Sequence, residues 1–397
     1  MSFLIREFWE VSVMKNLFSA VCRFLRPEIL LLILLLWSLC PAPALEAAPV
    51  VPDRDKPAAA SRIVVDQIGN EVELPAEVNR VVIASAWPLA SVFCLFEGNV
   101  EKLVGLDPAI ISAAENSLLI KVAPEIVHVP SGFSKNGILN VEELLKLKPD
   151  VVLYASAVPG DYEACKQAGI PAVGFRLDVK DFNAVETINS WMELLGRVMN
   201  TNIEANDFVA YGREMQAKVE ERLKGVPRDK KPRCMFIHGY EALAIRVPGA
   251  SSWADYWINA SGGVNVAAEA GKGTLGVNME QIYAWNPEKI FITNFLPLLP
   301  DDLYGNRVTG HDWAPVEAVK QKAVRKLPLG MYRWYVTCSD SALMLLWMAK
   351  ENHPELFEDI DMNRTVKDFY KRFYGLSLSD EEVASVFRPK REAAAGI

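Results

Sequence analysis

Residues 140–150 read NVEELLKLKPD, and residues 278–288 read NMEQIYAWNPE. The two stretches align without a gap at one offset, because 278 − 140 and 287 − 149 both equal 138. Both begin with Asn, carry Glu two residues later, and end with Pro followed by an acidic residue. A period of this length is far longer than a solenoid repeat or a propeller blade. The repeat therefore predicts two copies of one domain.

Each copy of the repeat predicts a short helix followed by a strand. The side chain of Asn140 or Asn278 can accept a hydrogen bond from a free N–H at a helix start, and a glutamate in the first turn suits the positive end of the helix dipole. The proline then ends the helix and favours an extended backbone. This chemistry explains Glu142 and Glu280 as helix-start acids. A second interpretation is that these two equivalent carboxylates, one in each copy, form a two-point docking face.

Strands and helices alternate along much of the remaining chain. Two short β-prone runs flank Gly69-Asn70, which predicts a hairpin. Apolar runs typical of buried strands lie at 81–84, 103–106, 151–154, 171–175, 233–237 and 289–293. This alternation predicts an α/β protein with a parallel sheet in each of two Rossmann-like lobes.

The segment between the two copies has a different pattern. From about residue 182 to 224 the chain is charged and nearly free of Gly and Pro, and apolar residues recur every three or four positions. This periodicity predicts helix. We predict a long linking helical segment at 182–226, between an N-terminal lobe at 62–181 and a C-terminal lobe at 227–397 that is closed by helices.

The N-terminal region has the three parts of a secretory signal peptide. Two arginines precede an apolar run at 29–36, and a Pro/Ala-rich site follows at 41–44. The run is too short to span a bilayer comfortably. We predict a cleaved signal peptide at 1–44, a linker at 45–61, and a mature protein in the periplasm or at the extracytoplasmic face of the inner membrane. Lipidation of Cys40 is a less favoured alternative, because the residue before it is larger than a lipobox normally tolerates.

The composition argues against several classes of binding partner and of metal site. The formal net charge of −8 argues against a nucleic-acid partner, which needs a basic face. The four histidines are not paired at metal-ligand spacing, so we expect no metal site built by the protein alone. Export permits disulfides, but the cysteines that remain after cleavage are scattered, and we expect buried free thiols. They are Cys94, Cys165, Cys234 and Cys338.

Several weak motifs in a fixed order resemble the substrate-binding proteins of iron-siderophore, haem and cobalamin ABC importers. The motifs are the opening hairpin with residues 80–82, the first repeat copy with its strand, and GGVNV at 262–266 before the second copy. The resemblance implies two α/β lobes bridged by one long backbone helix, and a monomeric carrier with modest lobe motion. It also implies that Glu142 and Glu280 meet arginines of a permease in the inner membrane.

An exported enzyme that uses the interlobe cleft is the alternative from another class. The sequence has no GxSxG, GxxxxGK, GxGxxG or HExxH in a convincing context. A metal-cluster scaffold is disfavoured by the dispersed cysteines. We therefore expect a binding protein without catalytic residues or a resident cofactor.

Ligands of two-lobed α/β proteins lie beyond the carboxyl ends of the strands. This rule selects Trp87 in the first lobe and His238 and Tyr240 in the second. In the resembled family the region of Trp253 often approaches the cleft. A lone histidine after a strand is more often a satisfied polar residue than a metal ligand, and direct metal contact by His238 stays open. We expect His353, at a helix end beside a proline, to be solvated.

The stretch GMYRWY at 330–335 is the last candidate. Its aromatic faces suit a planar or catecholate ligand, and Arg333 can pair with a carboxylate or an anionic chelate. We predict Arg333, Trp334 and Tyr335 as ligand-binding residues. A core strand with alternating residues, or a surface arginine stacked on tryptophan, is the alternative.

The resemblance and these residues favour a small metal chelate, in the first place an iron-siderophore. Cobalamin or another corrinoid comes next, then haem, and then a free metal ion or small metal complex. Haem usually takes an axial His, Met or Tyr, for which the sequence has candidates but no diagnostic motif.

Overall fold

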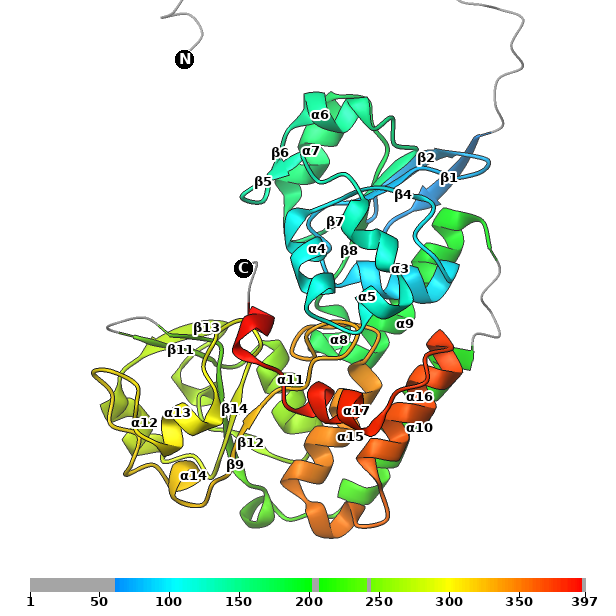
Figure 1. The fold of residues 1–397 in the computed structure, drawn as a ribbon. Coiled ribbons are helices and arrows are strands. Elements are labelled where there is room, and N and C mark those ends of the chain that lie inside the picture. The colour runs from blue at the N-terminus through cyan, green and yellow to red at the C-terminus, as the bar shows by residue number, and fades with distance from the viewer. Residues whose placement is uncertain (1–60, 202–206, 241–243, 395–397) are drawn as a thin grey trace, which may run out of the picture. The chain divides into compact units, whose positions relative to one another are not determined.

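A computed structural model describes residues 61–201, 207–240 and 244–394 (Figure 1). The predicted signal peptide at 1–44 and nearly all of the predicted linker at 45–61 lie outside the described residues, and Ser61 already belongs to the first strand. Within the described ranges, no helix combines the length and apolar character needed to cross a bilayer.

The first lobe opens with the predicted hairpin and contains a four-stranded parallel sheet. Strands β1 (Ser61–Val65) and β2 (Glu71–Pro75) pair antiparallel, and Val65 lies opposite Glu71. The sheet has the order β4-β3-β7-β8. Its strands are β3 (Val81–Ile83), β4 (Leu103–Leu106), β7 (Val151–Ala155) and β8 (Ala172–Phe175), and the other elements are α3 (Leu89–Glu97), α4 (Pro108–Glu115), α5 (Leu119–Val122), η1 (Pro124–His128), β5 (Ser134–Lys135), β6 (Ile138–Leu139), α6 (Val141–Lys146) and α7 (Pro159–Gln167).

The second lobe contains another four-stranded parallel sheet, in the order β12-β9-β14-β15, and a smaller antiparallel sheet, β10-β11-β13. The strands are β9 (Arg233–Ile237), β10 (Gly239–Tyr240), β11 (Ile245–Pro248), β12 (Val264–Asn265), β13 (Thr274–Val277), β14 (Lys289–Ile292) and β15 (Val324–Lys326). The helices are η2 (Arg228–Lys230), α11 (Trp253–Ala260), η3 (Ala268–Ala270), α12 (Met279–Trp285), α13 (Pro300–Tyr304), α14 (Glu317–Lys320), α15 (Ser341–Asn352), η4 (Pro354–Phe357), α16 (Met362–Tyr374), α17 (Asp380–Phe387) and η5 (Arg391–Ala394). The predicted α/β class with two lobes is confirmed.

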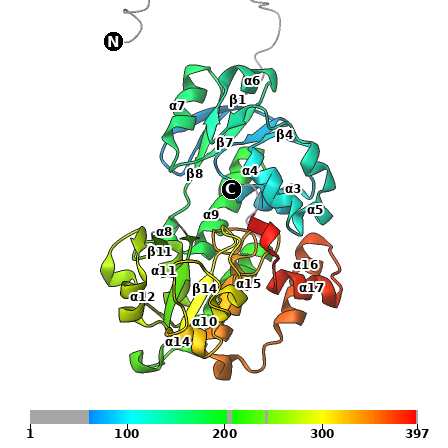
Figure 2. The same ribbon diagram turned by 60° about the vertical axis from the view of Figure 1, so that its left-hand side comes forward.

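The linking segment consists of two helices where the periodicity suggested one. Helix α9 (Ala184–Met199) follows the short α8 (Val179–Phe182), and α10 (Asp207–Leu223) comes next in the chain. Helix α9 ends at Asn200, whose left-handed backbone (φ 56°) is one that asparagine tolerates better than most residues. Helix α9 contacts α3 of the first lobe and α10 and α15 of the second, so it is the element that joins the lobes (Figure 2).

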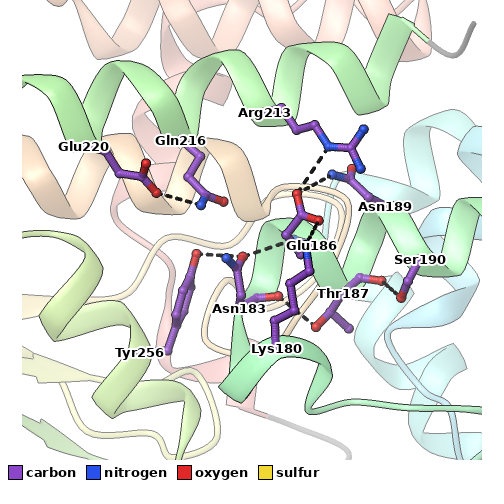
Figure 3. Close-up of polar contacts among 10 residues, drawn as sticks. All are labelled: Lys180, Asn183, Glu186, Thr187, Asn189, Ser190, Arg213, Gln216, Glu220 and Tyr256. Atoms are coloured by element: carbon purple, nitrogen blue, oxygen red, sulfur yellow. Dashed lines mark hydrogen bonds and ion pairs between the residues drawn. The ribbon is translucent and has the colours of Figure 1, made fainter.

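A polar network fixes the start of α9 (Figure 3). The side chain of Asn183 caps the helix by accepting from the Glu186 N–H at 3.0 Å, and it also accepts from the Tyr256 hydroxyl of α11 at 3.0 Å. The Glu186 carboxylate accepts from Lys180 Nζ at 2.7 Å and from Arg213 Nε of α10 at 3.3 Å. The network therefore ties the linking helix to two helices of the second lobe.

The two repeat copies have matching local structure, as predicted. The side chains of Asn140 and Asn278 cap α6 and α12 by accepting from the N–H three residues on, at 3.2 and 3.0 Å. Lys148 and Asn286 occupy equivalent positions, and both have a left-handed backbone with φ of 46° and 40°. The copies thus share their helix caps and the turn that leads to the next strand.

The acidic residue after the repeat proline has the same role in both lobes. Asp150 Oδ2 accepts from the N–H groups of Asn79 and Arg80, each at 2.8 Å, just before the central strand β3. Glu288 Oε2 accepts from the N–H of Arg233 at 2.8 Å, at the start of β9. Each carboxylate therefore anchors the start of the neighbouring strand of its sheet.

The lobes also touch through the segment that follows β15. The Leu118 N–H of the first lobe donates to the Gly330 carbonyl at 2.8 Å, and Lys121 pairs with Glu382 of α17. The Cys94, Cys165, Cys234 and Cys338 side chains are all free and buried, as predicted. The chain after Leu329 is therefore held between the two lobes.

Candidate ligand-binding site

A cavity of about 430 Å³ lies between the lobes, in the size range of small-molecule sites. The first lobe lines it with Ser85, Trp87, Pro88, Asp107, Ser134, Gly137, Leu139, Ala155, Ala157, Val158, Asp161 and Leu177. The second lobe lines it with His238, Trp253, Phe295, Tyr332 and Val336. Ser85, Ala157, Leu177 and His238 follow the carboxyl ends of β3, β7, β8 and β9, which is where the topology rule expects a ligand.

The first-lobe wall carries two buried carboxylates, and the first is Asp107. It follows β4 and caps α4, because its Oδ1 accepts from the Ala109 N–H at 2.9 Å. Its Oδ2 accepts from the Ser134 hydroxyl at 2.5 Å. Both oxygens have fixed partners, so this carboxylate is held rigidly at the cavity wall.

The second carboxylate, Asp161, lies in the first turn of α7. Burial raises its pKa, a hydrogen bond with Ser85 opposes that rise, and the nearby Asp107 carboxylate adds to it. Its Oδ2 is buried and has no hydrogen-bond partner among the described residues. A buried acceptor of this kind favours a ligand that brings a hydrogen-bond donor.

The second-lobe wall is aromatic. The His238 ring packs against Tyr335 and Phe295, with centroid distances of 5.0 and 5.2 Å. Burial lowers the pKa of His238, so its imidazole is neutral at pH 7. Trp253 begins α11, which is capped by the Ser252 hydroxyl, and its ring meets Tyr335 edge-on at 6.1 Å.

Arg333 lies directly behind this aromatic wall. Its guanidinium carbon is 5.2 Å from the Phe295 ring centroid and 5.9 Å from that of Tyr332, and both rings line the cavity. The residue is 1% exposed, and burial lowers its pKa. The guanidinium therefore packs on two rings that line the cavity, at cation–π distances.

Asp340 holds the segment that carries Tyr332. Its Oδ2 accepts from the N–H groups of Met331 and Tyr332 at 2.7 and 3.3 Å, and from Trp334 Nε1 at 3.1 Å. Burial raises the pKa of this carboxyl to about 7. Gly330 is required beside it, because a Cβ there would lie 1.9 Å from the Tyr370 hydroxyl. The second-lobe wall thus depends on a buried acid that does not itself line the cavity.

Three of the predicted ligand-binding residues line the cavity, namely Trp87, His238 and Trp253. Two more, Arg333 and Tyr335, lie behind the aromatic wall and contact its members. Tyr335 cannot turn toward a ligand without disturbing the packing, because its ring is enclosed by surrounding aromatic rings. These two residues support the wall.

The structure places the other two predicted residues elsewhere in the second lobe. The Tyr240 hydroxyl accepts from Trp313 Nε1 at 3.2 Å, and its ring meets His311 edge-on at 4.9 Å, because β10 turns the side chain toward that loop. Trp334 turns away from the cavity to reach Asp340. Neither Tyr240 nor Trp334 lines the cavity.

The prediction of a solvated His353 is wrong. The residue is buried, and its Nε2 lies 2.9 Å from the Gly262 carbonyl. The chain turns inward after α15 and places the ring against the glycine-rich segment before β12. This packing could not be predicted from the sequence, because the contact joins His353 to a segment 91 residues earlier in the chain.

Sequence reasoning missed Asp107, Ser134 and Asp161 in the cavity and Asp340 behind it. Asp107 directly follows a predicted strand, so the rule that selected Trp87 could also have found it. Asp161 and Ser134 come from a helix and a hairpin whose direction the sequence does not reveal. Among the described residues, no group of three or more His, Cys, Asp or Glu side chains is placed to hold a metal ion.

Glu142 and Glu280 lie apart from the cavity lining. Each is exposed in the first turn of its helix, α6 or α12. Helix α6 begins directly after β6, whose Leu139 lines the cavity. The predicted docking residue of the first lobe is therefore close in the chain to the cavity wall.

Comparisons with known proteins agree with this architecture. A family model described as a periplasmic binding protein matches residues 94–329, more than half of the chain. The molybdate-binding protein MolA of Haemophilus influenzae is 25% identical over 347 residues, which cover 82% of this chain and 95% of that protein.

Solved structures show the same fold. A periplasmic solute binding protein from Veillonella parvula superposes with a TM-score of 0.74 at 29% identity, over 85% of this chain and all of that one. Helicobacter pylori CeuE in a Ni-His complex gives a TM-score of 0.64 at 25% identity, over 83% of this chain and 99% of that one.

Proposed function

The chain belongs to the periplasmic binding protein family, and on that premise we propose that it captures a compact metal chelate between its lobes. It is an extracytoplasmic solute-binding protein of an ABC importer, as the sequence resemblance implied. We further propose that it is exported by the cleavable signal peptide at 1–44, acts as a monomer without catalysis, and passes its ligand to a permease in the inner membrane.

The observation that carries the ligand proposal is the opposite chemistry of the two cavity walls. The first lobe offers two carboxylates, and the buried Oδ2 of Asp161 has no partner among the described residues, so it can accept a hydrogen bond from a ligand. The second lobe offers aromatic faces backed by the Arg333 cation. A chelate that presents N–H or O–H donors at one end, and carboxylate or catecholate groups with flat faces at the other, satisfies both walls. An iron-siderophore of compact size meets this description.

A small metal complex with an amino acid is a second form of the same proposal. The CeuE complex with nickel and histidine contains such a ligand, in a protein with this fold. An amino-acid complex carries amine donors and carboxylate acceptors together, so it also matches the two walls. Cobalamin, another corrinoid or haem is the alternative within the importer class.

A free oxyanion such as molybdate is the second candidate function. The name of the relative MolA and the buried Arg333 guanidinium behind the second-lobe wall favour it. The two carboxylates of the first-lobe wall oppose it, because like charges repel strongly where water is excluded. An exported enzyme is less favoured than either carrier.

Tryptophan fluorescence tests the proposal, because Trp87 and Trp253 line the cavity. The mature protein is titrated with ferric siderophores, the nickel–histidine complex, cobalamin, haemin and molybdate. Saturable quenching by a siderophore or by the nickel complex is expected, and it should weaken in the Trp87→Phe and Trp253→Phe variants. Saturation by molybdate, with no response to any chelate, would contradict the chelate proposal.

The delivery step is tested by reversing the charges of Glu142 and Glu280. We propose that these exposed carboxylates dock the loaded protein on the permease. The Glu142→Lys/Glu280→Lys variant should abolish uptake and leave the fluorescence titration unchanged. Normal uptake by this variant would remove the docking role.

A further inference from the structure

Large apolar side chains are exposed at only a few places in the described part of the chain. They are Ile63, Val65, Ile68, Ile138, Leu145 and Tyr283. The first three belong to the β1–β2 hairpin. The others lie on, or just before, the two helices that carry the repeat glutamates. Both of these helices therefore expose a large apolar side chain as well as a repeat glutamate.

Leu145 and Tyr283 occupy the same position in the two repeat copies, because 283 − 145 is again 138. Each lies three residues after its glutamate, which makes the two side chains neighbours on one face of the helix. Leu145 is 47% exposed and Tyr283 is 38% exposed. Both lobes thus present the same unit, a carboxylate followed one turn later by a large apolar side chain.

The apolar part of the second-lobe unit is held in place. The Tyr283 hydroxyl donates to the Asp312 carbonyl at 2.5 Å, which fixes the exposed ring. In the first lobe, Ile138 is also exposed, at 73%, on β6 shortly before α6 in the chain. A side chain that is ordered before binding loses less entropy on contact.

We propose that Leu145 and Tyr283 are the apolar anchors of a docking surface for the importer's permease, with Glu142 and Glu280 as its charged part. This inference rests on the proposed function. Two equivalent units fit a membrane partner with two equivalent halves that present basic residues beside apolar ones. In protein interfaces, buried aromatic and aliphatic side chains contribute most of the affinity, and charges at the rim set orientation and on-rate.

Site-specific photo-crosslinking tests this surface in cells that express the full chain with its importer. A benzoylphenylalanine is placed at position 145, at 283, or at the control position 63 on the hairpin. Adducts with an integral-membrane importer subunit, identified by mass spectrometry, are expected at 145 and 283 and not at 63. Equal adducts at 63, adducts only with a second copy of this chain, or no permease adduct would each overturn the proposal.

A variant pair separates this inference from the proposed function. Leu145→Asn/Tyr283→Asn should lower the yield of permease adduct from a probe at the exposed position 281 of α12 at least fivefold. The matched control Ile63→Thr/Val65→Thr should leave that yield unchanged. If the adduct at 281 persists undiminished, the apolar anchors are refuted while glutamate docking stands. If no probe at 281 reaches the permease even in the otherwise unchanged chain, the delivery step itself fails.

Discussion

The two lobes build their sheets in the same way and give the cavity different side chains. In the first lobe, Asp150 anchors the start of the central strand, and in the second lobe Glu288 does the same. At the opposite end of these strands the correspondence stops. The first lobe ends in carboxylates at Asp107 and Asp161, and the second in aromatic rings around His238.

This difference separates the parts of the repeat that build the fold from those that bind. The matched positions are helix caps, a left-handed turn and strand anchors, all of which satisfy backbone groups. The unmatched positions lie in the segments after the strands, which can change without disturbing the sheet. Two copies of one domain can therefore form an asymmetric site.

The largest expected effect comes from removing Asp340, which would break the second-lobe wall alone. The Asp340→Ala variant leaves the N–H groups of Met331, Tyr332 and Trp334 without their acceptor. Buried unsatisfied donors cost about 1–3 kcal/mol each, so we expect the free energy of unfolding to fall by about 3 kcal/mol or more. Urea denaturation at pH 7 measures it, and a loss below about 1 kcal/mol would show that the wall does not depend on this acid.

The raised pKa of Asp340 also predicts that the free energy of unfolding depends on pH. The pKa of Asp340 is raised to about 7 in the folded protein, whereas an unfolded aspartate titrates near 4. Between these values the folded state binds more protons, so stability decreases as pH rises and levels off above about 7. Urea midpoints should show this slope in the unmodified chain and a flatter one in Asp340→Asn. Identical slopes of the urea midpoint against pH in the two proteins would contradict the raised pKa of Asp340.

Ligand binding should respond to changes in both walls. If a chelate binds with donors toward the first lobe and acceptors toward the second, Asp161→Asn and Arg333→Met should each weaken binding about tenfold, the cost of one charged hydrogen bond or cation contact. The fluorescence titration measures both with the chelate that saturates the signal. Tighter binding by Asp161→Asn, together with weaker binding by Arg333→Met, would instead indicate an oxyanion.

The smallest effect is expected at the carboxylates that anchor a strand in each lobe. Asp150 accepts two backbone N–H groups and Glu288 accepts one, on partly exposed segments. We expect Asp150→Ala to cost about 1–2 kcal/mol and Glu288→Ala about 1 kcal/mol. Chemical denaturation of both variants measures the difference. A larger loss for Glu288→Ala would mean that the two anchors are not equivalent.

Much of the fold was predictable because it depends on local signals. The repeat, the apolar runs and the hairpin around Gly69-Asn70 predicted the two lobes and six of the eight strands in their parallel sheets. The shorter strands, such as β12 and β15, were not predicted. The break after α9 was missed, because helical periodicity continues across it and only Asn200 marks the end. Tertiary contacts then decide that α10 packs within the second lobe.

The cavity lining was predictable mainly in the segments that follow strands, and the resemblance added Trp253. The rule for the carboxyl ends of strands found Trp87 and His238, and would also have found Asp107. It misplaced Tyr240, because the short strand β10 redirects the side chain toward His311. From the stretch at 330–335, Tyr332 lines the cavity, and none of the three predicted residues, Arg333, Trp334 and Tyr335, does. The contacts of Asp340, further along the chain, hold this segment in place.

The short path from Leu139 to Glu142 has an energetic consequence. Leu139 of β6 lines the cavity and α6 starts two residues later, so a ligand in the cavity and a permease at Glu142 would act on one continuous segment. If the loaded protein binds the permease more tightly than the empty one, thermodynamic linkage requires that the docked protein hold its ligand more tightly by the same factor. Docking alone then cannot release the cargo. The work of release must come from the transporter's nucleotide cycle.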